Sequence, residues 1–235
     1  MGKATIYICT YKDFESKVSN KAYIPLDNKG ISTDLPLDLD DKFYSEIYHY
    51  KYVSEHLPRT KYIGFCHYRK YFDFFDNLPN FDDIFKQYDV IASKPFRFPY
   101  TVRGQYAAMH NEEDLNIITD IIKEKYPKYL DDWENSLNSE FLYGCNMFIM
   151  RTQDFKEYIK FILDVLNEYV KKIGTDINKH IEDNKDKYLK PFYPNNSVEY
   201  QYRIGGYLAE RLTSMYLQRM GKIKTYNVIV TERKY

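Results

Sequence analysis

The chain has 235 residues, which fits one α/β domain with a sizeable hydrophobic core. Lysine plus arginine and aspartate plus glutamate both number 34, so no global charge attracts nucleic acid, and any anion site must be local. No apolar run approaches the length of a bilayer span, and the N-terminal residues show no signal-peptide pattern. The widely spaced Cys9, Cys66 and Cys145 are typical of reduced thiols in a cytoplasmic protein.

The first half of the chain predicts three buried strands and one helix. The runs 4–10, 62–68 and 89–93 are apolar and β-branched, as buried strands are. Residues 20–40 contain proline and glycine breakers and predict an irregular segment. Residues 42–56 carry aromatic rings at helical spacing and predict a helix.

The second half predicts three helices. Residues 111–125 and 154–173 have amphipathic patterns, and the first opens on acidic residues that favour a helix N-terminus. Residues 200–220 predict another helix, broken near its Gly205-Gly206 pair, where the missing side chains would allow a close backbone approach. The stretch 174–190, rich in lysine and aspartate, predicts an exposed connection.

Buried strands are also predicted at 141–150 and 226–230. Strands that alternate with helices imply an α/β fold, in which a mostly parallel sheet is flanked by helices. No internal repeat or linker interrupts the pattern, so residues 1–235 are expected to form a single domain. In such folds ligands bind beyond the carboxyl ends of the strands.

The stretch YIGFCHYRKYF ends one buried strand on a group of basic side chains, His67, Arg69 and Lys70. A core has no room for so many charges, so their presence at a strand end predicts a site for something negative. The alternative is that Arg69 and Lys70 form surface ion pairs with Asp73 and Asp76.

Two helices place further charged residues near this predicted site. Glu46 lies in a helix that is otherwise apolar and aromatic on one face, so its carboxylate needs a partner, for which the strand-end cations are candidates. Spacings of three and four residues place Arg203, Tyr207 and either Glu210 or Arg211 near one face of the last long helix. Arg203 could then reach the same anion, and the alternative is an internal arginine–glutamate pair that fixes the helix.

Three segments together carry a family resemblance: FYSEIYHYKYV (43–53) leading into YIGFCHYRKYF (62–72), NMFIM (146–150), and YQYRIGGYLAERL (200–212). In this order they resemble the bacterial capsule and O-antigen family long known as a domain of unknown function, whose characterised member is a galactofuranosyltransferase. The resemblance covers nearly the whole chain. Lys70, Ser45 and Thr10-Tyr11-Lys12 stand where the family has an arginine, a cysteine and Thr-His-Lys.

This resemblance implies a GT-A-like, Rossmann-like glycosyltransferase. It would transfer galactofuranose from UDP-galactofuranose to a lipid-linked cell-surface glycan of a capsule or lipopolysaccharide O-antigen, with inversion to a β-linkage. The protein is expected in the cytoplasm, and a peripheral position at the inner face of the plasma membrane stays open. Other transferases of the same pathway are possible partners. Two alternatives remain: a transferase that uses another nucleotide sugar, and a non-catalytic glycan-binding subunit of a synthesis complex.

The resemblance also implies a donor site. The end of the first strand would contact the nucleotide, and His67 and Arg69 with Arg203 would hold the diphosphate by charge-assisted hydrogen bonds. These cations stand in place of the Asp-X-Asp pair that holds a metal in most GT-A enzymes, so neither a divalent metal nor another cofactor is expected. The expected donor-binding residues are Thr10, Tyr11, Lys12, His67, Tyr68, Arg69 and Arg203.

The acceptor and its general base complete the expected site. Inverting transfer needs a base near the acceptor hydroxyl, and Glu210 is the first candidate, followed by Asp114 and Asp131. Asn146 could instead tie loops together, and His110 could cap a helix. The residues expected to contact the acceptor or the sugars are Tyr71, Tyr100, His110, Asn146 and Tyr207.

Overall fold

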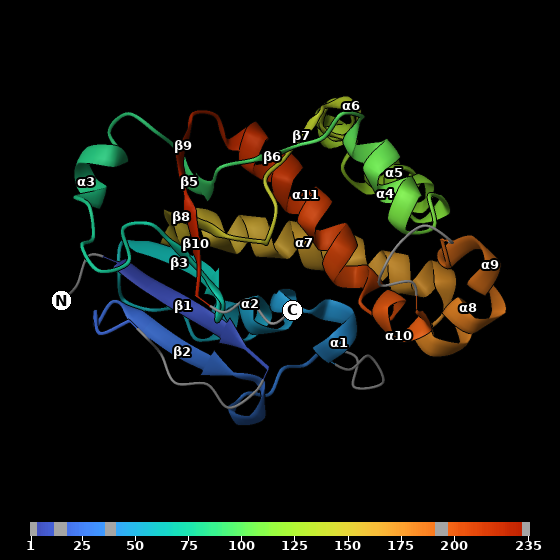
Figure 1. Cartoon of the computed structure of the whole chain (residues 1–235), viewed down its shortest axis with the longest axis horizontal. Coiled ribbons are helices and arrows are strands. Elements are labelled where there is room, and N and C mark those ends of the chain that lie inside the picture. Colours follow the sequence, from blue (N-terminus) through green and yellow to red (C-terminus); the bar gives the residue numbers. More distant parts are fainter. Residues whose placement is uncertain (1–3, 12–17, 36–40, 191–196, 232–235) are drawn as a thin grey trace.

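A mixed sheet and a layer of helices form the molecule (Figure 1). The computed structural model describes residues 4–11, 18–35, 41–190 and 197–231. From one edge of the sheet to the other, paired strands follow the order β2 (Tyr23–Asp27), β1 (Ala4–Thr10), β3 (Tyr62–His67), β8 (Phe148–Arg151), β5 (Val90–Ser93) and β9 (Ile223–Tyr226).

The longest strand pairings are parallel. β1 pairs in parallel with both β2 and β3, and β5 pairs in parallel with β9. β8 is antiparallel and lies between β3 and β5. The pairing of β8 with β3 ends at Phe65. At His67, β3 pairs instead with the antiparallel β4 (Lys70–Phe72), which in turn pairs with β10 (Val228–Val230). The end of β3 is therefore the point where the sheet divides.

Each face of the sheet carries its own hydrophobic core, because side chains alternate along each strand. On β1, Tyr7 and Cys9 face the helices, whereas Ile6 and Ile8 face the segment that follows β3. The helices packed on the first face are α1 (Asp41–Tyr44), α2 (Glu46–Glu55), α7 (Thr152–Ile173) and α11 (Ile204–Met220). The second face is covered by the segment that contains β4 and α3 (Phe81–Ile84).

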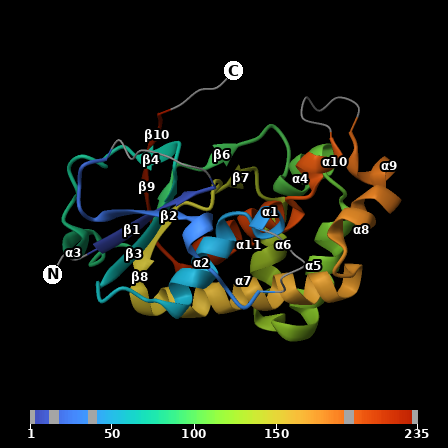
Figure 2. The ribbon, with the colours of Figure 1, turned by 90° about the horizontal axis from the view of Figure 1, so that it is seen from below.

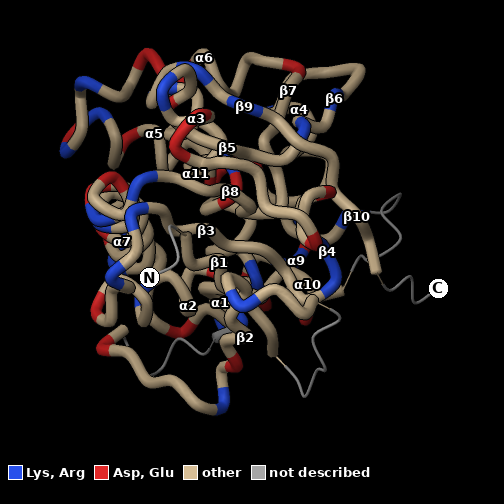
Figure 3. The backbone as a smooth tube through the Cα atoms, turned by 90° about the vertical axis from the view of Figure 1, so that its left-hand side faces the viewer, with Lys and Arg blue, Asp and Glu red and all other residues tan. Residues whose placement is uncertain are grey.

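The remaining helices form the opposite end of the molecule (Figure 2). They are α4 (Val102–Met109), α5 (Glu113–Lys125), α6 (Leu130–Asn138), α8 (Ile177–Asp183), α9 (Lys185–Tyr188) and α10 (Val198–Gln201), with short 3₁₀ turns at Asn28–Gly30 and Pro127–Tyr129. A separate two-stranded ribbon joins β6 (Phe96–Arg97) to β7 (Phe141–Leu142). Basic and acidic residues are intermingled along the chain (Figure 3). Among the described residues, no helix is both long and apolar enough to cross a membrane.

The structure confirms the α/β fold with its mostly parallel sheet and flanking helices, together with the strand at 4–10 and the helices near 111–125 and 154–173. The prediction of an irregular segment at 20–40 was wrong in part, because β2 forms there as an edge strand that tolerates Pro25. The prediction of an exposed connection at 174–190 was also wrong. It forms α8 and α9, and buried Ile177 and Ile181 dock the first of these.

The predicted helix at 42–56 is two helices, α1 and α2, which meet at Ser45 with φ 53°. The predicted break near Gly205 and Gly206 was wrong, because α11 runs through both glycines and the interruption precedes it. A Cβ on Gly206 would lie 2.6 Å from the Ser45 Cβ, and one on Gly205 would lie 2.7 Å from the Phe43 carbonyl oxygen. The expected close backbone approach is confirmed, and α11 packs directly on the junction of α1 and α2.

The predicted strand at 141–150 is interrupted. β7 and β8 are separated by a turn, residues 143–147, in which Cys145 and Asn146 have φ values of 67° and 50°. Left-handed backbone is rare for residues with a side chain, so the apolar pattern gave no sign of it. Among the helices, α4 and α6 were not predicted, and Asp131 lies in the first turn of α6.

Candidate functional site

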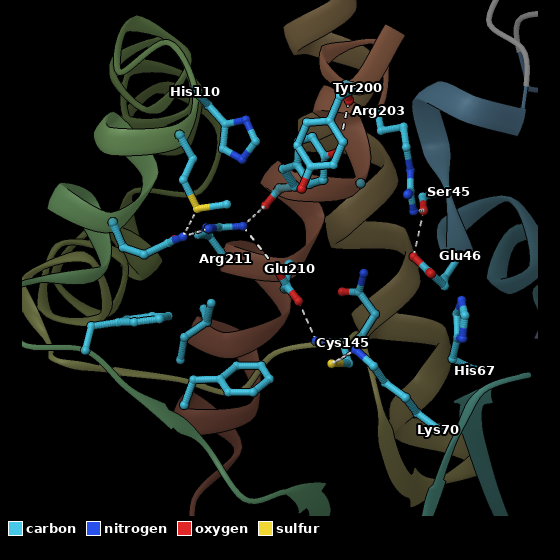
Figure 4. A pocket seen from close by; sticks show the side chains of 18 of the residues that line it. Ser45, Glu46, His67, Lys70, His110, Cys145, Tyr200, Arg203, Glu210 and Arg211 are labelled. Carbon is cyan, nitrogen blue, oxygen red and sulfur yellow. Dashed lines mark hydrogen bonds and ion pairs between the residues drawn. The ribbon is translucent and has the colours of Figure 1, made fainter. Parts of the chain in front are cut away.

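A cavity of about 430 Å³ opens where the end of β3 meets the start of α11 (Figure 4). Its charged side chains and imidazoles come from α2, the end of β3 and the turn into β4, the end of α4, and α11 with the residue before it: Glu46, His67, Arg69, Lys70, His110, Arg203, Glu210 and Arg211. Figure 4 shows Ser45, Glu46 and His67 on one side and His110 and Arg211 on the other, with Glu210 between them. The structure therefore brings together the predicted strand-end cluster and the predicted helix face.

A second cavity, of about 350 Å³, adjoins the first. Tyr11, Lys42 and Tyr68 line it alone, while its other walls are shared with the first cavity. The shared residues are Ser45, His67, Arg69 and Arg203. Two compartments thus meet at a wall that carries two guanidinium groups.

Ser45 connects the two helices that form this wall. Its hydroxyl donates to Glu46 Oε2 at 2.8 Å, and it accepts from Arg203 Nη2 at 3.0 Å. The Tyr11 hydroxyl lies 3.2 Å from the same oxygen. Burial opposes the charged form of Glu46, but His67, Arg203 and these hydrogen bonds together hold the pKa of this carboxyl below its usual value. Glu46 is therefore an ionised carboxylate that fixes Arg203 in place.

His67 is a neutral imidazole at neutral pH. Burial lowers its pKa to about 4, the cations Arg69, Lys70 and Arg203 act in the same direction, and Glu46 opposes them. Its Nδ1 accepts from the Arg69 backbone N–H at 3.2 Å, so the ring proton lies on Nε2. His67 can donate a hydrogen bond to a ligand, but it adds no charge to the site. At neutral pH the charge that stabilises ionised Glu46 comes from Arg203.

The strand-end cations, Arg69 and Lys70, line the cavity. Within the part of the chain that the structure describes, Arg69 and Lys70 make no ion pair, and Arg69 Nε is buried without a hydrogen bond. The Arg69 guanidinium lies 5.1 Å from the Tyr68 ring centroid, and Lys70 Nζ lies 2.9 Å from Cys145 Sγ. The surface pairing with Asp73 is wrong, since its carboxylate accepts from the backbone and side-chain amides of Asn227.

Backbone strain concentrates around the same cavity. Among the described residues, the non-glycine positions with positive φ are Ser45, Cys145 and Asn146, and all three line it. Such conformations persist only where the surroundings impose them. Tyr50 donates to the Asn146 carbonyl oxygen from one side of the 143–147 turn. The turn leaves Asn146 Oδ1 buried, without a partner among the described residues.

Glu210 holds the other side of this turn. One carboxylate oxygen accepts from the Cys145 N–H, and the second accepts from Arg211 Nη1 at 3.0 Å. Arg211 in turn donates to Gln105 and to the Tyr207 carbonyl oxygen. The internal arginine–glutamate pair therefore exists, with Arg211 in place of Arg203. Sequence reasoning had Arg211 as the alternative to Glu210 on this helix face, but it missed Gln105.

His110 and Tyr207 form a stacked pair on the far wall, with ring centroids 4.3 Å apart. The Gln201 amide nitrogen donates to two carbonyl groups, so its Oε1 accepts from His110 Nδ1, 2.8 Å away. Burial, with a contribution from Arg211, lowers the pKa of His110 to about 3. His110 ends α4 and does not cap α5, whose N-cap is Glu112.

Several predicted residues are not at the cavities. Tyr71 is 1% exposed, and its hydroxyl donates to the Tyr68 carbonyl oxygen, so its ring belongs to the core. Thr10 is buried at the end of β1, where its carbonyl oxygen accepts from His49 Nε2. Tyr100 is exposed outside both cavities. Lys12 lies outside the described residues.

The alternative bases lie elsewhere as well. Asp131 is exposed on α6. Asp114 is buried between helices and accepts from three tyrosine hydroxyls, so it does not reach the cavity. In the described ranges, no group of three or more histidine, cysteine, aspartate and glutamate side chains is arranged to hold a metal ion.

Comparison with known proteins places the chain among known folds. The family profile described as "Domain of unknown function (DUF4422)" matches residues 5–222. No curated protein matches significantly. The solved apo structure of a protein named WbbM bifunctional glycosyltransferase is similar, with a TM-score of 0.68 and 17% sequence identity. The match covers 99% of this chain and 46% of that one, so the chain spans less than half of its length. This likeness shows a shared fold.

Proposed function

The chain belongs to the DUF4422 family, and from this premise we propose that it is a glycosyltransferase that uses a nucleoside-diphosphate sugar. The observation that carries the proposal is the excess of cations where the two cavities meet. Arg69, Lys70 and Arg203 face this region, and Arg69 Nε is buried without a partner among the described residues. A diphosphate offers the oxygens that such donors need.

The two cavities suit the two ends of such a donor. The smaller cavity has tyrosine rings, Tyr11 and Tyr68, against which a nucleoside can pack. The diphosphate would lie at the shared wall, between Arg69 and Arg203, with the His67 Nε2–H as a further donor. The sugar would then extend into the larger cavity, towards the 143–147 turn.

The reaction follows from this placement. An acceptor hydroxyl oxygen attacks the anomeric carbon, the bond from that carbon to the diphosphate oxygen breaks, and the nucleoside diphosphate leaves. Negative charge grows on the leaving oxygen, where the fixed cations Arg69, Lys70 and Arg203 stabilise it. In this proposal they do what a divalent ion does in many transferases, so transfer is metal-independent.

The acceptor proton needs a carboxylate, and two line the larger cavity, Glu46 and Glu210. Both oxygens of Glu210 are engaged, by the Cys145 N–H and by Arg211. We therefore assign Glu210 a positioning role, in place of the base expected from the sequence. Glu46 is held ionised and gives one oxygen to Ser45, so it is our candidate for the base.

The family resemblance supports a finer proposal. The sugar is galactofuranose, delivered from UDP-galactofuranose with inversion to a lipid-linked glycan of a capsule or O-antigen, at the cytoplasmic side of the membrane. The motif YIGFCHYRKYF supports this because it supplies His67, Arg69 and Lys70 to the cavity. The differences from the family at Ser45 and Lys70 lie on the cavity wall, so they bear on the choice of donor.

A panel of nucleotide sugars and oligosaccharide acceptors, with and without EDTA, tests the proposal by mass spectrometry. We expect one donor to be consumed and the activity to survive EDTA. Arg69→Ala and Arg203→Ala should reduce turnover. Arg219→Ala should not, because Arg219 lies at the far end of α11, where it pairs with Asp132 of α6. A protein that binds glycans but consumes no donor would instead be a non-catalytic subunit.

A further inference from the structure

Exposed aromatic side chains gather beside the larger cavity. In the described part of the chain, the large hydrophobic side chains that are exposed include Phe96 (48%), Tyr100 (49%) and Phe141 (43%). All three belong to the β6–β7 ribbon or to the turn that leads from it into α4. Exposed rings in one place mark a contact surface more often than scattered ones do.

The two faces of this ribbon differ. Residues directly opposite each other in an antiparallel pair share a face, and β6–β7 pairs Phe96 with Leu142 and Arg97 with Phe141. Phe96, Phe98 and Leu142 line the larger cavity, whereas Phe141 lies with Arg97 on the other face. The ribbon thus presents one aromatic face to the cavity and one to its surroundings.

The aromatic face continues from the cavity to the surface. Phe98 lines the cavity, and Tyr100 stacks on it with ring planes 5° apart and centroids at 6.1 Å. Phe96 is held by the 143–147 turn, since a Cβ on Gly144 would lie 2.5 Å from the Phe96 ring. The same Cβ would lie 3.1 Å from Glu210 Oε1, so Phe96 and Glu210 lie close together beside the 143–147 turn.

This side of the cavity suits an uncharged polar ring. Arg211 is neutralised by Glu210 and hydrogen-bonded to Gln105, and Lys70 Nζ donates to Cys145 Sγ. Asn146 Oδ1, in a residue that is 4% exposed, is a buried acceptor without a partner among the described residues. A sugar combines a C–H face that packs on aromatic rings with hydroxyl groups that donate hydrogen bonds.

We propose that Phe96, Phe98 and Tyr100 form the platform on which the acceptor glycan lies. The terminal sugar packs on Phe96 inside the cavity and donates a hydroxyl to Asn146 Oδ1, and the preceding sugars extend over Phe98 and Tyr100. This inference rests on the proposed function and assigns the acceptor class, an oligosaccharide of at least two sugars. A lipid surface fits less well, because Arg97, the cation of the ribbon, is paired with Glu140.

Direct binding tests the platform apart from the chemistry. Wild type, Phe96→Ala, Tyr100→Ala and Phe141→Ala are compared for binding to immobilised galactose-, glucose- and N-acetylglucosamine-terminated tetrasaccharides in the presence of UDP. Phe141→Ala is the matched control, because it removes an equally exposed ring from the other face of the same ribbon. We expect the first two variants to bind at least one tetrasaccharide about tenfold more weakly and the control to bind as wild type does.

Three results would overturn the platform. These are binding of no tetrasaccharide by the wild type, equal binding by all variants, and equal loss in Phe141→Ala. A membrane contact would give a different result. The wild type would bind phosphatidylglycerol vesicles, Phe96→Ala would not, and both proteins would bind the tetrasaccharides equally. Failure to consume any nucleotide sugar, with tetrasaccharide binding as expected, would contradict the proposed function and leave the platform standing. UDP binding, measured in the same variants, should not change.

Discussion

Two buried polar clusters in this molecule are built on opposite principles. Around Asp114, hydroxyl groups of Tyr106, Tyr169 and Tyr188 donate to the carboxylate at 3.0, 2.8 and 2.8 Å, and they join α4, α5, α7 and α9. In the cavity at the end of β3, Arg69 Nε and Asn146 Oδ1 are buried and lack partners within the described residues. Because buried polar groups are normally satisfied, the first cluster serves the fold and the second one awaits a ligand.

The carboxylates of the two clusters respond to burial in opposite ways. Burial raises the pKa of Asp114 to about 7, even though three hydroxyl groups donate to it. Glu46 is also removed from water, yet its pKa is lowered, because protonated His67 and Arg203 both favour its ionised form. The pKa of a buried carboxylate thus depends on the charges around it, and the charges around Glu46 are positive.

Removing a cation from the cavity should have the largest effect and should leave the fold intact. We expect Arg203→Ala and Arg69→Ala each to lower kcat about 100- to 1,000-fold, since each removes a donor to the leaving diphosphate. The melting temperature should change little in Arg69→Ala, whereas it should fall in Arg203→Ala, because that variant removes the charge that stabilises ionised Glu46. Arg203→Lys should recover part of the activity, because it restores the charge without the planar pair of donors. Steady-state kinetics measure kcat, and thermal melts measure the melting temperature. If Arg69→Ala lost stability as much as activity, the cavity cluster would serve the fold as the Asp114 cluster does.

Asp114→Ala should do the reverse. It leaves three buried tyrosine hydroxyls without their acceptor, so we expect the free energy of unfolding to fall by about 3 kcal/mol. The KM for the donor should stay as in wild type, because Asp114 does not line the cavity. Urea unfolding monitored by circular dichroism gives the stability. Asp114→Asn, which keeps an acceptor oxygen, is the control and should lose less.

Gly206→Ala connects the two effects, because it acts on the wall between the helices. The new Cβ would lie 2.6 Å from the Ser45 Cβ, so we expect a loss of about 1–3 kcal/mol in the free energy of unfolding and a higher donor KM. The control is Gly104→Ala in α4, where the nearest contact of a Cβ is 3.4 Å. That variant should be as stable as wild type or slightly more stable. A Gly206→Ala protein with unchanged stability would mean that α11 does not pack on Ser45 as closely as described.

The smallest effect is a pH dependence that belongs to Asp114 alone. Its pKa is raised in the folded state, so its contribution to stability is complete below the unfolded pKa of about 3.9 and is lost as pH rises to about 7. His67 and His110, whose pKa values are lowered to about 4 and about 3, act in the opposite direction over part of this range. The wild-type stability minus that of Asp114→Asn should therefore fall by roughly 1 kcal/mol per pH unit between pH 5 and 7. A flat difference would show that Asp114 is ionised throughout.

The sequence predicted the features that depend on local pattern. The strands at 4–10 and 62–67, the long helix α7 and the cationic end of β3 all follow from periodicity and composition. It also brought Arg203, Tyr207 and Glu210 to one site through helical spacing.

Features that depend on long-range contacts could not be predicted. The left-handed turn at Cys145 and Asn146 is imposed by Tyr50 and Glu210, which lie far away in the sequence. Tyr71 reads like any exposed aromatic residue, but β10 and the second core cover it. The role of Glu210 depends on Arg211 and Cys145 together, which no single motif reveals.

Calorimetric titration of UDP into the protein in EDTA tests the central claim most directly. If Arg69, Lys70 and Arg203 hold the diphosphate, wild type should bind UDP without a metal, and the affinity should fall as salt rises. The Arg69→Ala/Arg203→Ala double variant should show no measurable binding, while Arg219→Ala should bind as wild type does. UDP binding that requires manganese, or that survives in the double variant, would contradict the account.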